Sequence, residues 1–140
     1  MSKAAVVAVV VGGALPAGVI GSIAAVGIWL SGPAPTAFSL DGLPEATVHN
    51  YHFIESEPDL ASRIPCYCGC RSLSHRNLLD CYLRPDGGYE QHASGCGICG
   101  WEADDVEQML GESMDPSRIR AAIDEEYGSY GKPTDTPEGT

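Results

Sequence analysis

The sequence predicts a mostly α-helical protein: an N-terminal transmembrane helix plus one small α-rich domain with two cysteine loops organised around a metal site. Three observations lead to this prediction. An apolar run without a single charge extends from Ala4 to Leu30. Six cysteines follow, all between Cys66 and Cys99. Apolar residues after the last cysteine recur at three- and four-residue intervals, which is the period of an amphipathic helix.

Composition divides the 140 residues into four parts. Residues 1–30 are predicted to be the transmembrane anchor, and residues 31–46, rich in Pro, Gly and Ala, a flexible spacer. Residues 47–130 are predicted to form the cysteine-rich metal-binding domain, and residues 131–140 a disordered tail. A domain this small buries little apolar surface, so disulfides or a metal commonly supplement its core.

The apolar run exceeds the roughly 20 residues that a helix needs to cross a bilayer. It is also longer than the roughly 7–15 residues of a signal-peptide core, so we predict an uncleaved anchor, with a cleaved signal as the alternative. Lys3 before the run favours a cytoplasmic N-terminus. The expected location is therefore the cell membrane, crossed once, with the cysteine domain outside. That compartment is oxidising, which makes disulfides a competing explanation of the cysteines.

Local signals predict the elements of the soluble part. Residues 47–55 fit a short strand or an irregular packing segment. Capping residues, prolines and glycines then predict four helices: one starting at Ser56 and ending before Pro65, one over residues 74–82, one over residues 101–110, and one from Asp115 to Gly128. The two cysteine loops precede the second and third of these helices.

The net charge of −11 argues against a nucleic-acid partner, because phosphate binding requires a basic surface. It is compatible with metal cations and with basic protein surfaces. The sequence shows no Ser/His/Asp order, phosphate-binding loop or paired carboxylates that would support hydrolytic chemistry. We therefore predict a binding protein rather than an enzyme.

Spacing predicts that the six thiols converge. In Cys-x-Cys-x-Cys, alternate side chains of an extended segment project to the same side. The later Cys-x-x-Cys lies in a glycine-rich loop before a helix, whose dipole is expected to lower thiol pKa. Two histidines fall in the same window, whereas His49 and His52 lie outside it. The predicted metal ligands are Cys66, Cys68, Cys70, Cys81, Cys96, Cys99, His75 and His92.

Copper(I) is the predicted metal, because it is soft, accepts two or three thiolates and tolerates thiolates that bridge several ions. A single zinc site would take four ligands and leave Cys68 and Cys81 unused. An iron–sulfur cluster ranks third.

The resulting hypothesis is a membrane-anchored, extracytoplasmic protein that stores copper(I) or delivers it to a protein partner. Two alternatives remain. One is a disulfide-stapled accessory or interaction module of a membrane complex, since an even number of cysteines fits such a staple. The other is a thiol oxidoreductase that uses Cys96 and Cys99.

Five motifs make the chain resemble the PCYCGC-motif family over residues 51–127. They are Pro65-Cys66-Tyr67-Cys68-Gly69-Cys70, Glu57-Pro58-Asp59-Leu60, His75-x-x-Leu78-x-Asp80-Cys81, His92-x-x-Gly95-Cys96-Gly97-x-Cys99 and Ile119-Arg120-x-x-Ile123-Asp124. The resemblance implies a small, exported, membrane-associated bacterial protein of largely uncharacterised function. Relatives are often predicted lipoproteins, and this chain departs from them by lacking a lipid-acceptor cysteine.

Overall fold

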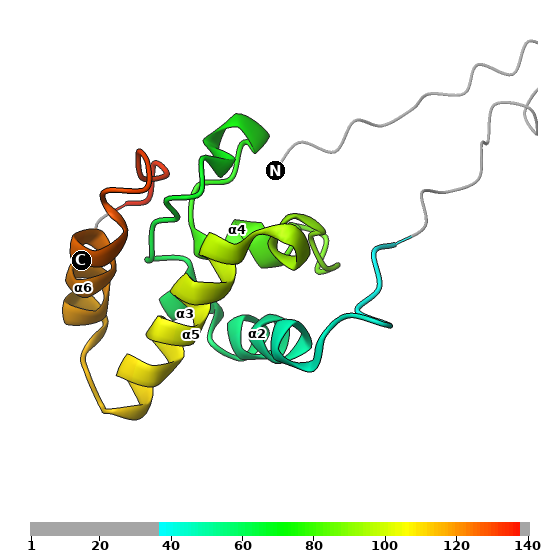
Figure 1. Cartoon of the computed structure of the whole chain (residues 1–140), viewed down its shortest axis with the longest axis horizontal. Helices are drawn as coiled ribbons and strands as arrows, with labels where there is room; N and C mark the ends of the chain where they lie inside the picture. The colour runs from blue at the N-terminus through cyan, green and yellow to red at the C-terminus, as the bar shows by residue number, and fades with distance from the viewer. Residues whose placement is uncertain (1–36, 138–140) are drawn as a thin grey trace, which may run out of the picture. The chain divides into compact units, whose positions relative to one another are not determined.

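The computed structural model describes residues 37–137, and within this range the chain is helical, as predicted (Figure 1). A single antiparallel bridge, between Leu83 and Tyr89, is the only β-pairing of the described residues. The elements are α2 (Glu45–Ser56), α3 (Pro58–Ala61), η1 (Cys70–Leu73), α4 (Leu78–Tyr82), η2 (His92–Gly95), α5 (Gly97–Gly111) and α6 (Pro116–Tyr127).

Among residues 37–137, no helix combines the length and the apolar character needed to cross a membrane. The predicted anchor, and residues 31–36 of the predicted spacer, lie outside the described residues.

Helix α2 replaces the strand or irregular segment predicted for residues 47–55. It begins at Glu45, whose carboxylate in the first turn favours the positive end of the helix. Its buried residues include Tyr51 and Ile54, which are three positions apart and therefore share one helical face. The predicted segment began at residue 47 and so left out the acidic first turn. The short apolar pattern of residues 47–55 alone does not distinguish a helix from a strand.

Three helix starts differ from the prediction, and one agrees with it. Helix α3 begins at Pro58 with Glu57 at its N-cap, and Ser56, the predicted start, is the last residue of α2. Helix α4 begins at Leu78 and is capped by Asn77, whereas Ser74 adopts a left-handed conformation with φ of 68°. Helix α5 begins at Gly97, so that the predicted second cysteine loop is partly helical. Asp115 caps α6 as predicted, because its side chain accepts a hydrogen bond from the amide of Arg118.

Helix α5 is the central element of the domain and packs against α2, α4 and α6. Tyr51 of α2 meets Tyr82 of α4 edge to face, with ring centroids 5.0 Å apart. The hydroxyl of Tyr82 donates to the carbonyl of Cys99 at 2.7 Å. The aromatic core thus fixes the first turn of α5, which carries Cys99.

The C-terminal segment also differs from the disordered tail predicted from residue 131. Up to residue 137 it lies against the domain, and both Thr134 and Thr136 are buried. The amide of Thr134 donates to the carbonyl of Cys66 at 3.0 Å. At Gly131 a Cβ atom would lie 2.7 Å from the carbonyl oxygen of Tyr67, so only glycine permits this close approach.

Candidate metal centre

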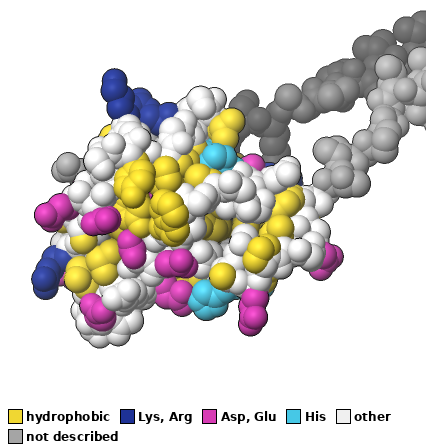
Figure 2. Space-filling view, viewed as in Figure 1, with side chains coloured by type: hydrophobic (Ala, Val, Ile, Leu, Met, Phe, Trp, Pro, Cys, Tyr) yellow, Lys and Arg dark blue, Asp and Glu magenta, His cyan; other side chains and the backbone are white. Residues whose placement is uncertain are grey.

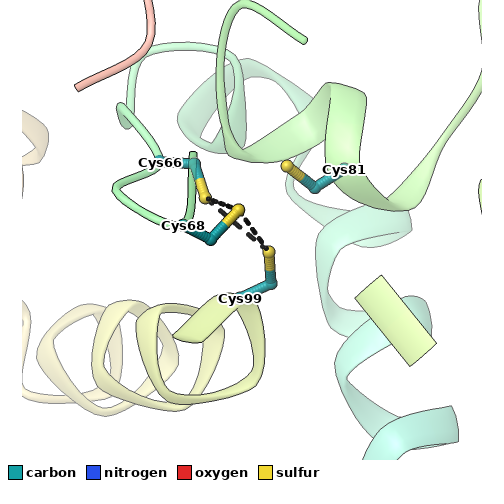
Figure 3. Close-up of side chains that lie close together, drawn as sticks. All are labelled: Cys66, Cys68, Cys81 and Cys99. Carbon is teal, nitrogen blue, oxygen red and sulfur yellow. Dashed lines mark hydrogen bonds between the residues drawn. The ribbon is translucent and has the colours of Figure 1, made fainter. Parts of the chain in front are cut away.

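Three sulfur atoms from two separate segments meet at one point, as the spacing predicted (Figure 3). Cys66 and Cys68 come from the loop before η1, and Cys99 comes from the first turn of α5. The Cys66 Sγ lies 3.3 Å from the Cys68 Sγ and 3.6 Å from the Cys99 Sγ. The Cys99 and Cys68 sulfurs are also 3.6 Å apart, which closes a triangle.

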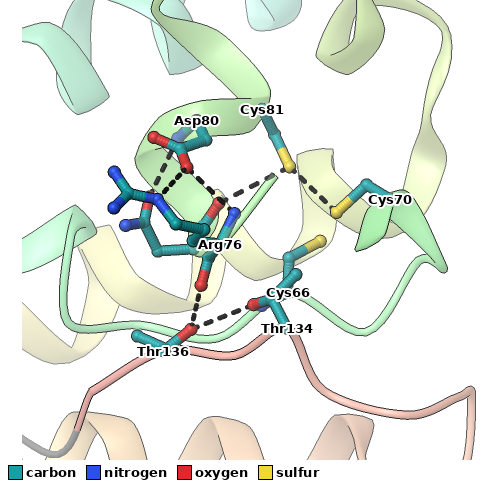
Figure 4. A network of polar contacts seen from close by, with 8 residues as sticks. Cys66, Cys70, Arg76, Asp80, Cys81, Thr134 and Thr136 are labelled. Carbon is teal, nitrogen blue, oxygen red and sulfur yellow. Dashed lines mark hydrogen bonds and ion pairs between the residues drawn. The ribbon is translucent and has the colours of Figure 1, made fainter. Parts of the chain in front are cut away.

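Cys70 and Cys81 add a second pair beside this triangle (Figure 4). Their sulfur atoms are 3.3 Å apart, and the Cys81 thiol also donates to the carbonyl of Asn77 at 3.7 Å. All six cysteines lie in the described range, and each is a free thiol.

Three sets of four side chains have their ligand atoms within 4.8 Å of one another. Every set contains Cys68. The sets are Cys66, Cys68, Cys81 and Cys99; Cys68, Cys70, Cys81 and His92; and Cys68, Cys96, Cys99 and His92. Together they include all six predicted cysteines and one of the two predicted histidines, so the ligands form one connected cluster rather than separate sites.

Hydrogen bonds from distant parts of the chain fix the backbone of the loop that carries the first three cysteines. The amide of Cys66 donates to the Thr134 hydroxyl at 2.9 Å (Figure 4). Tyr67 reaches two helices: its amide donates to the Glu102 carboxylate of α5 at 2.8 Å, and its hydroxyl donates to Asp124 of α6 at 2.7 Å. Gly69 supplies the turn into η1 with a left-handed φ of 86°, a conformation that favours glycine.

Burial divides the cluster into two groups. Cys66, Cys81 and Cys99 have no exposed surface, and Cys70 is 1% exposed; we call these four the buried thiols. Cys68, Cys96 and His92 are half-buried, and we call them the open edge. Cys68 contacts both groups, so it connects the interior of the cluster to the surface.

Cys68 differs from the other five cysteines in its pKa, which is lowered where theirs are raised. Hydrogen bonds from Cys66, and then from Cys70 and Cys81, hold the pKa of the Cys68 thiol far below its ordinary value. The contact with Cys68 is conversely the largest cause that raises the pKa of Cys66 and of Cys96. The expected lowering at the start of α5 is therefore not found at Cys96. Metal loading must displace protons from the remaining thiols.

The two predicted histidines occupy different positions. The Nε2 atom of His92 lies 3.2 Å from the Cys68 Sγ, and His92 belongs to two of the three ligand sets. The ring of His75 lies edge to face against that of His92, with centroids 5.4 Å apart, but belongs to no set. The Nδ1 of His75 is buried without a hydrogen-bond partner, and burial, followed by His92, lowers its pKa. His75 is thus a neighbour of the cluster.

The two histidines outside the cysteine window lie apart from the cluster, as expected. His49 contacts Glu107 at 2.7 Å, and His52 contacts Glu55 at 3.5 Å. Both are exposed partners of carboxylates on the surface of the domain.

Glu102 is a site residue that the sequence prediction missed. Its side chain is fully buried, and one carboxylate oxygen has no hydrogen-bond partner. Burial is the largest cause that raises its pKa to about 7. The predicted helix started at residue 101, and the sequence prediction assigned no role to Glu102. The three-residue interval from Cys99 was the available signal, since it places both side chains on one helical face.

The donor set fits a soft metal ion. Thiolates and imidazole are the ligands that copper(I) and zinc prefer, and a tetrahedral ion with metal–sulfur bonds of about 2.3 Å separates its sulfurs by about 3.8 Å. The sulfur separations of 3.3 and 3.6 Å are slightly smaller, so binding requires only small outward movements. The three cysteines of the loop, Cys81 of α4 and Cys99 of α5 can therefore supply a metal cluster, with Cys96 and His92 at its surface.

Comparison with known protein families agrees with the resemblance that the cysteine motifs indicated. A family described as "Protein of unknown function with PCYCGC motif" matches residues 34–139. No curated protein and no solved structure matches the chain.

Proposed function

The chain belongs to the PCYCGC-motif family, and from this premise and the geometry of the cysteines we propose that it binds copper(I) in a single polynuclear thiolate cluster, for storage or delivery. The observation that carries the proposal is the presence of Cys68 in all three ligand sets. One sulfur cannot belong to three separate mononuclear sites, but a thiolate can bridge neighbouring copper(I) ions.

Copper(I) is favoured over zinc because one zinc ion would leave a buried cysteine unbound. Zinc bound by Cys66, Cys68, Cys81 and Cys99 would complete a tetrahedral site. Cys70 would then stay buried as a thiol 3.3 Å from a zinc ligand. Copper(I) ions with two or three sulfur ligands each can use all six thiols.

The open edge supplies the route by which the metal is exchanged. Cys68, Cys96 and His92 are half-buried, so a donor or acceptor can reach them while the buried thiols stay covered. Exchange of copper between proteins proceeds by ligand replacement, which requires at least one accessible thiolate. The hydrogen bonds from Cys66, Cys70 and Cys81 that lower the pKa of Cys68 favour its thiolate form.

We place this activity at the outer face of the cell membrane, with residues 4–30 as the anchor and a protein of the same compartment as the exchange partner. This part of the proposal rests on the uncharged apolar run and on Lys3 before it.

Metal and thiol counting on the full chain tests the proposed function. The protein is reduced anaerobically and titrated with copper(I) or zinc against a competing chelator, and free thiols are counted before and after. We expect two or more copper ions per chain and protection of all six thiols. Six free thiols without bound copper would refute the proposal, as would a single zinc that copper does not displace. Absence of free thiols before reduction would support the disulfide-stapled alternative.

Two matched substitutions test the bridging role of Cys68. Cys68→Ser removes a ligand common to all three sets, whereas Cys96→Ser removes a ligand of one set. We expect Cys68→Ser to lower the copper stoichiometry by more than one ion per chain, and Cys96→Ser by one ion at most. Equal losses would show that Cys68 is an ordinary terminal ligand.

A further inference from the structure

Two exposed aromatic side chains lie beside the metal centre. Trp101 in α5 is 54% exposed, and Tyr130 after α6 is 53% exposed. Their ring centroids are 6.5 Å apart, and Tyr127 lies 5.7 Å from Tyr130. Exposing a tryptophan and a tyrosine together keeps apolar surface in water, and both residue types are enriched at binding hot spots.

Carboxylates surround these rings. The three aromatic side chains, together with Asp104, Asp105 and Glu126, line a hollow of about 360 Å³. Asp105 accepts a hydrogen bond from the Tyr127 hydroxyl at 2.6 Å. No ion pair of the described residues involves Asp104 or Glu126. On the face shown in Figure 2, hydrophobic side chains gather centrally, acidic side chains flank them, and Lys and Arg lie toward the periphery.

The hollow continues to the open edge of the metal centre. A second hollow, of about 340 Å³, is lined by Cys96, Trp101 and Asp104 among others, and so shares two residues with the first. The two hollows are therefore neighbours that share Trp101 and Asp104 in their walls, and we call them together the groove, with Tyr130 in one hollow and Cys96 in the other. A molecule seated in this groove reaches a ligand of the metal cluster.

We propose that this groove docks a basic segment of a partner protein, with Lys or Arg side chains on the aromatic rings and next to Asp104 and Glu126. Aromatic faces attract cations, and neighbouring carboxylates add to that attraction. A second copy of this chain is disfavoured by charge, because each copy carries −11. The purpose of docking, to hold a metal-exchange partner at Cys96, rests on the proposed function, whereas docking itself does not.

Fluorescence of Trp101 reads out the docking directly. The chain has two tryptophans, so Trp29→Phe leaves Trp101 as the sole tryptophan, whose emission is excited selectively at wavelengths that tyrosine does not absorb. The full chain in nonionic detergent, reduced and metal-free, is titrated with a short peptide of alternating Arg and Gly, and with a peptide of alternating Glu and Gly as control. We expect a saturable change with the Arg peptide, weakened by added salt, and no change with the Glu peptide.

Charge-matched variants separate docking in the groove from general attraction of a cation to an acidic protein. Affinity is measured for these variants by calorimetry. Asp104→Asn and Glu126→Gln are each expected to weaken binding about twofold to threefold, and Trp101→Ala about threefold to tenfold. Asp41→Asn removes the same charge from an exposed position outside the groove and is expected to leave the affinity unchanged. Circular dichroism checks that each variant is folded.

Three results would overturn the docking proposal: equal effects of Asp41→Asn and Asp104→Asn, no effect of Trp101→Ala, or dimerisation of the chain that Trp101→Ala abolishes. The metal titration is run separately on the same preparation. Copper binding without docking refutes only this inference, and docking without copper binding refutes only the proposed function.

Discussion

The buried thiols and the open edge of the cluster carry the same chemistry in different surroundings. Cys66, Cys70, Cys81 and Cys99 are buried in the core, and the C-terminal segment is hydrogen-bonded to the backbone of Cys66. Cys68, Cys96 and His92 remain half-buried. Under the proposed function, a metal ion among the buried thiols would be protected from water and from competing ligands, whereas an ion at the open edge would be exchangeable. One cluster would then combine retention with release.

Stabilisation by bound metal is expected to distinguish the buried thiols from the open edge most strongly. At a free copper(I) concentration a thousandfold above Kd, binding adds about 4 kcal/mol to the free energy of unfolding. For a domain of this size, that corresponds to a rise in Tm of roughly 15 °C or more. We expect Cys81→Ser, among the buried thiols, to lose more than half of this rise, and Cys96→Ser, at the open edge, less than half.

Thermal unfolding followed by circular dichroism under anaerobic conditions measures both variants. The metal-loaded and metal-free forms of each variant are compared, so that the loss of stability caused by the introduced serine itself cancels. Equal losses in the two variants would break the distinction between the buried thiols and the open edge.

A smaller effect concerns Glu102, which lies behind the buried thiols. Its pKa is about 7 in the folded protein, against an ordinary 4.5. The folded state therefore binds the proton more tightly than the unfolded state. Stability of the metal-free protein falls as pH rises from about 4.5 to 7, by about 3 kcal/mol from this group.

Glu102→Gln keeps an oxygen that accepts from the Tyr67 amide and removes the buried charge. We expect it to stabilise the metal-free protein by about 2–3 kcal/mol at pH 8 and to change little at pH 4. Urea unfolding at pH 4, 6 and 8 measures this difference, with the exposed Glu125→Gln as control. A gain that is the same at all three pH values would contradict the titration of Glu102.

The smallest effect concerns the C-terminal segment, which is hydrogen-bonded to the backbone of Cys66. Thr134→Val leaves the amide of Cys66 without its acceptor. We expect a loss of about 1–2 kcal/mol in the free energy of unfolding, measured by urea titration of the metal-free protein. Thr47→Val, in a half-buried position of α2, is the matched control and is expected to change stability little. If both variants behave alike, the segment does not hold the loop in place.

Much of the metal centre could be predicted because its signals are local. The dense cysteines of the first loop, the Cys-x-x-Cys at the start of α5 and the cap at Asp115 all act within a few residues. The parts that the sequence did not predict depend on tertiary contacts. Glu102 is buried where it accepts a hydrogen bond from the amide of Tyr67, and the C-terminal segment is held by hydrogen bonds to the backbone of Cys66. In each case the partner lies more than 30 residues away in the sequence. From composition alone, a glutamate and a polar C-terminal segment are both expected to be exposed to solvent.

X-ray absorption at the copper edge of the loaded full chain tests whether Cys68 bridges copper ions in a single cluster. We expect that copper is copper(I), that each ion has mainly sulfur neighbours, and that a second copper lies close enough to appear as a distinct scattering shell. In Cys68→Ser the copper–copper shell should disappear while sulfur ligation persists. Copper surrounded by nitrogen and oxygen, or sulfur-bound copper with no metal neighbour in the wild-type protein, would contradict a single cluster bridged by Cys68.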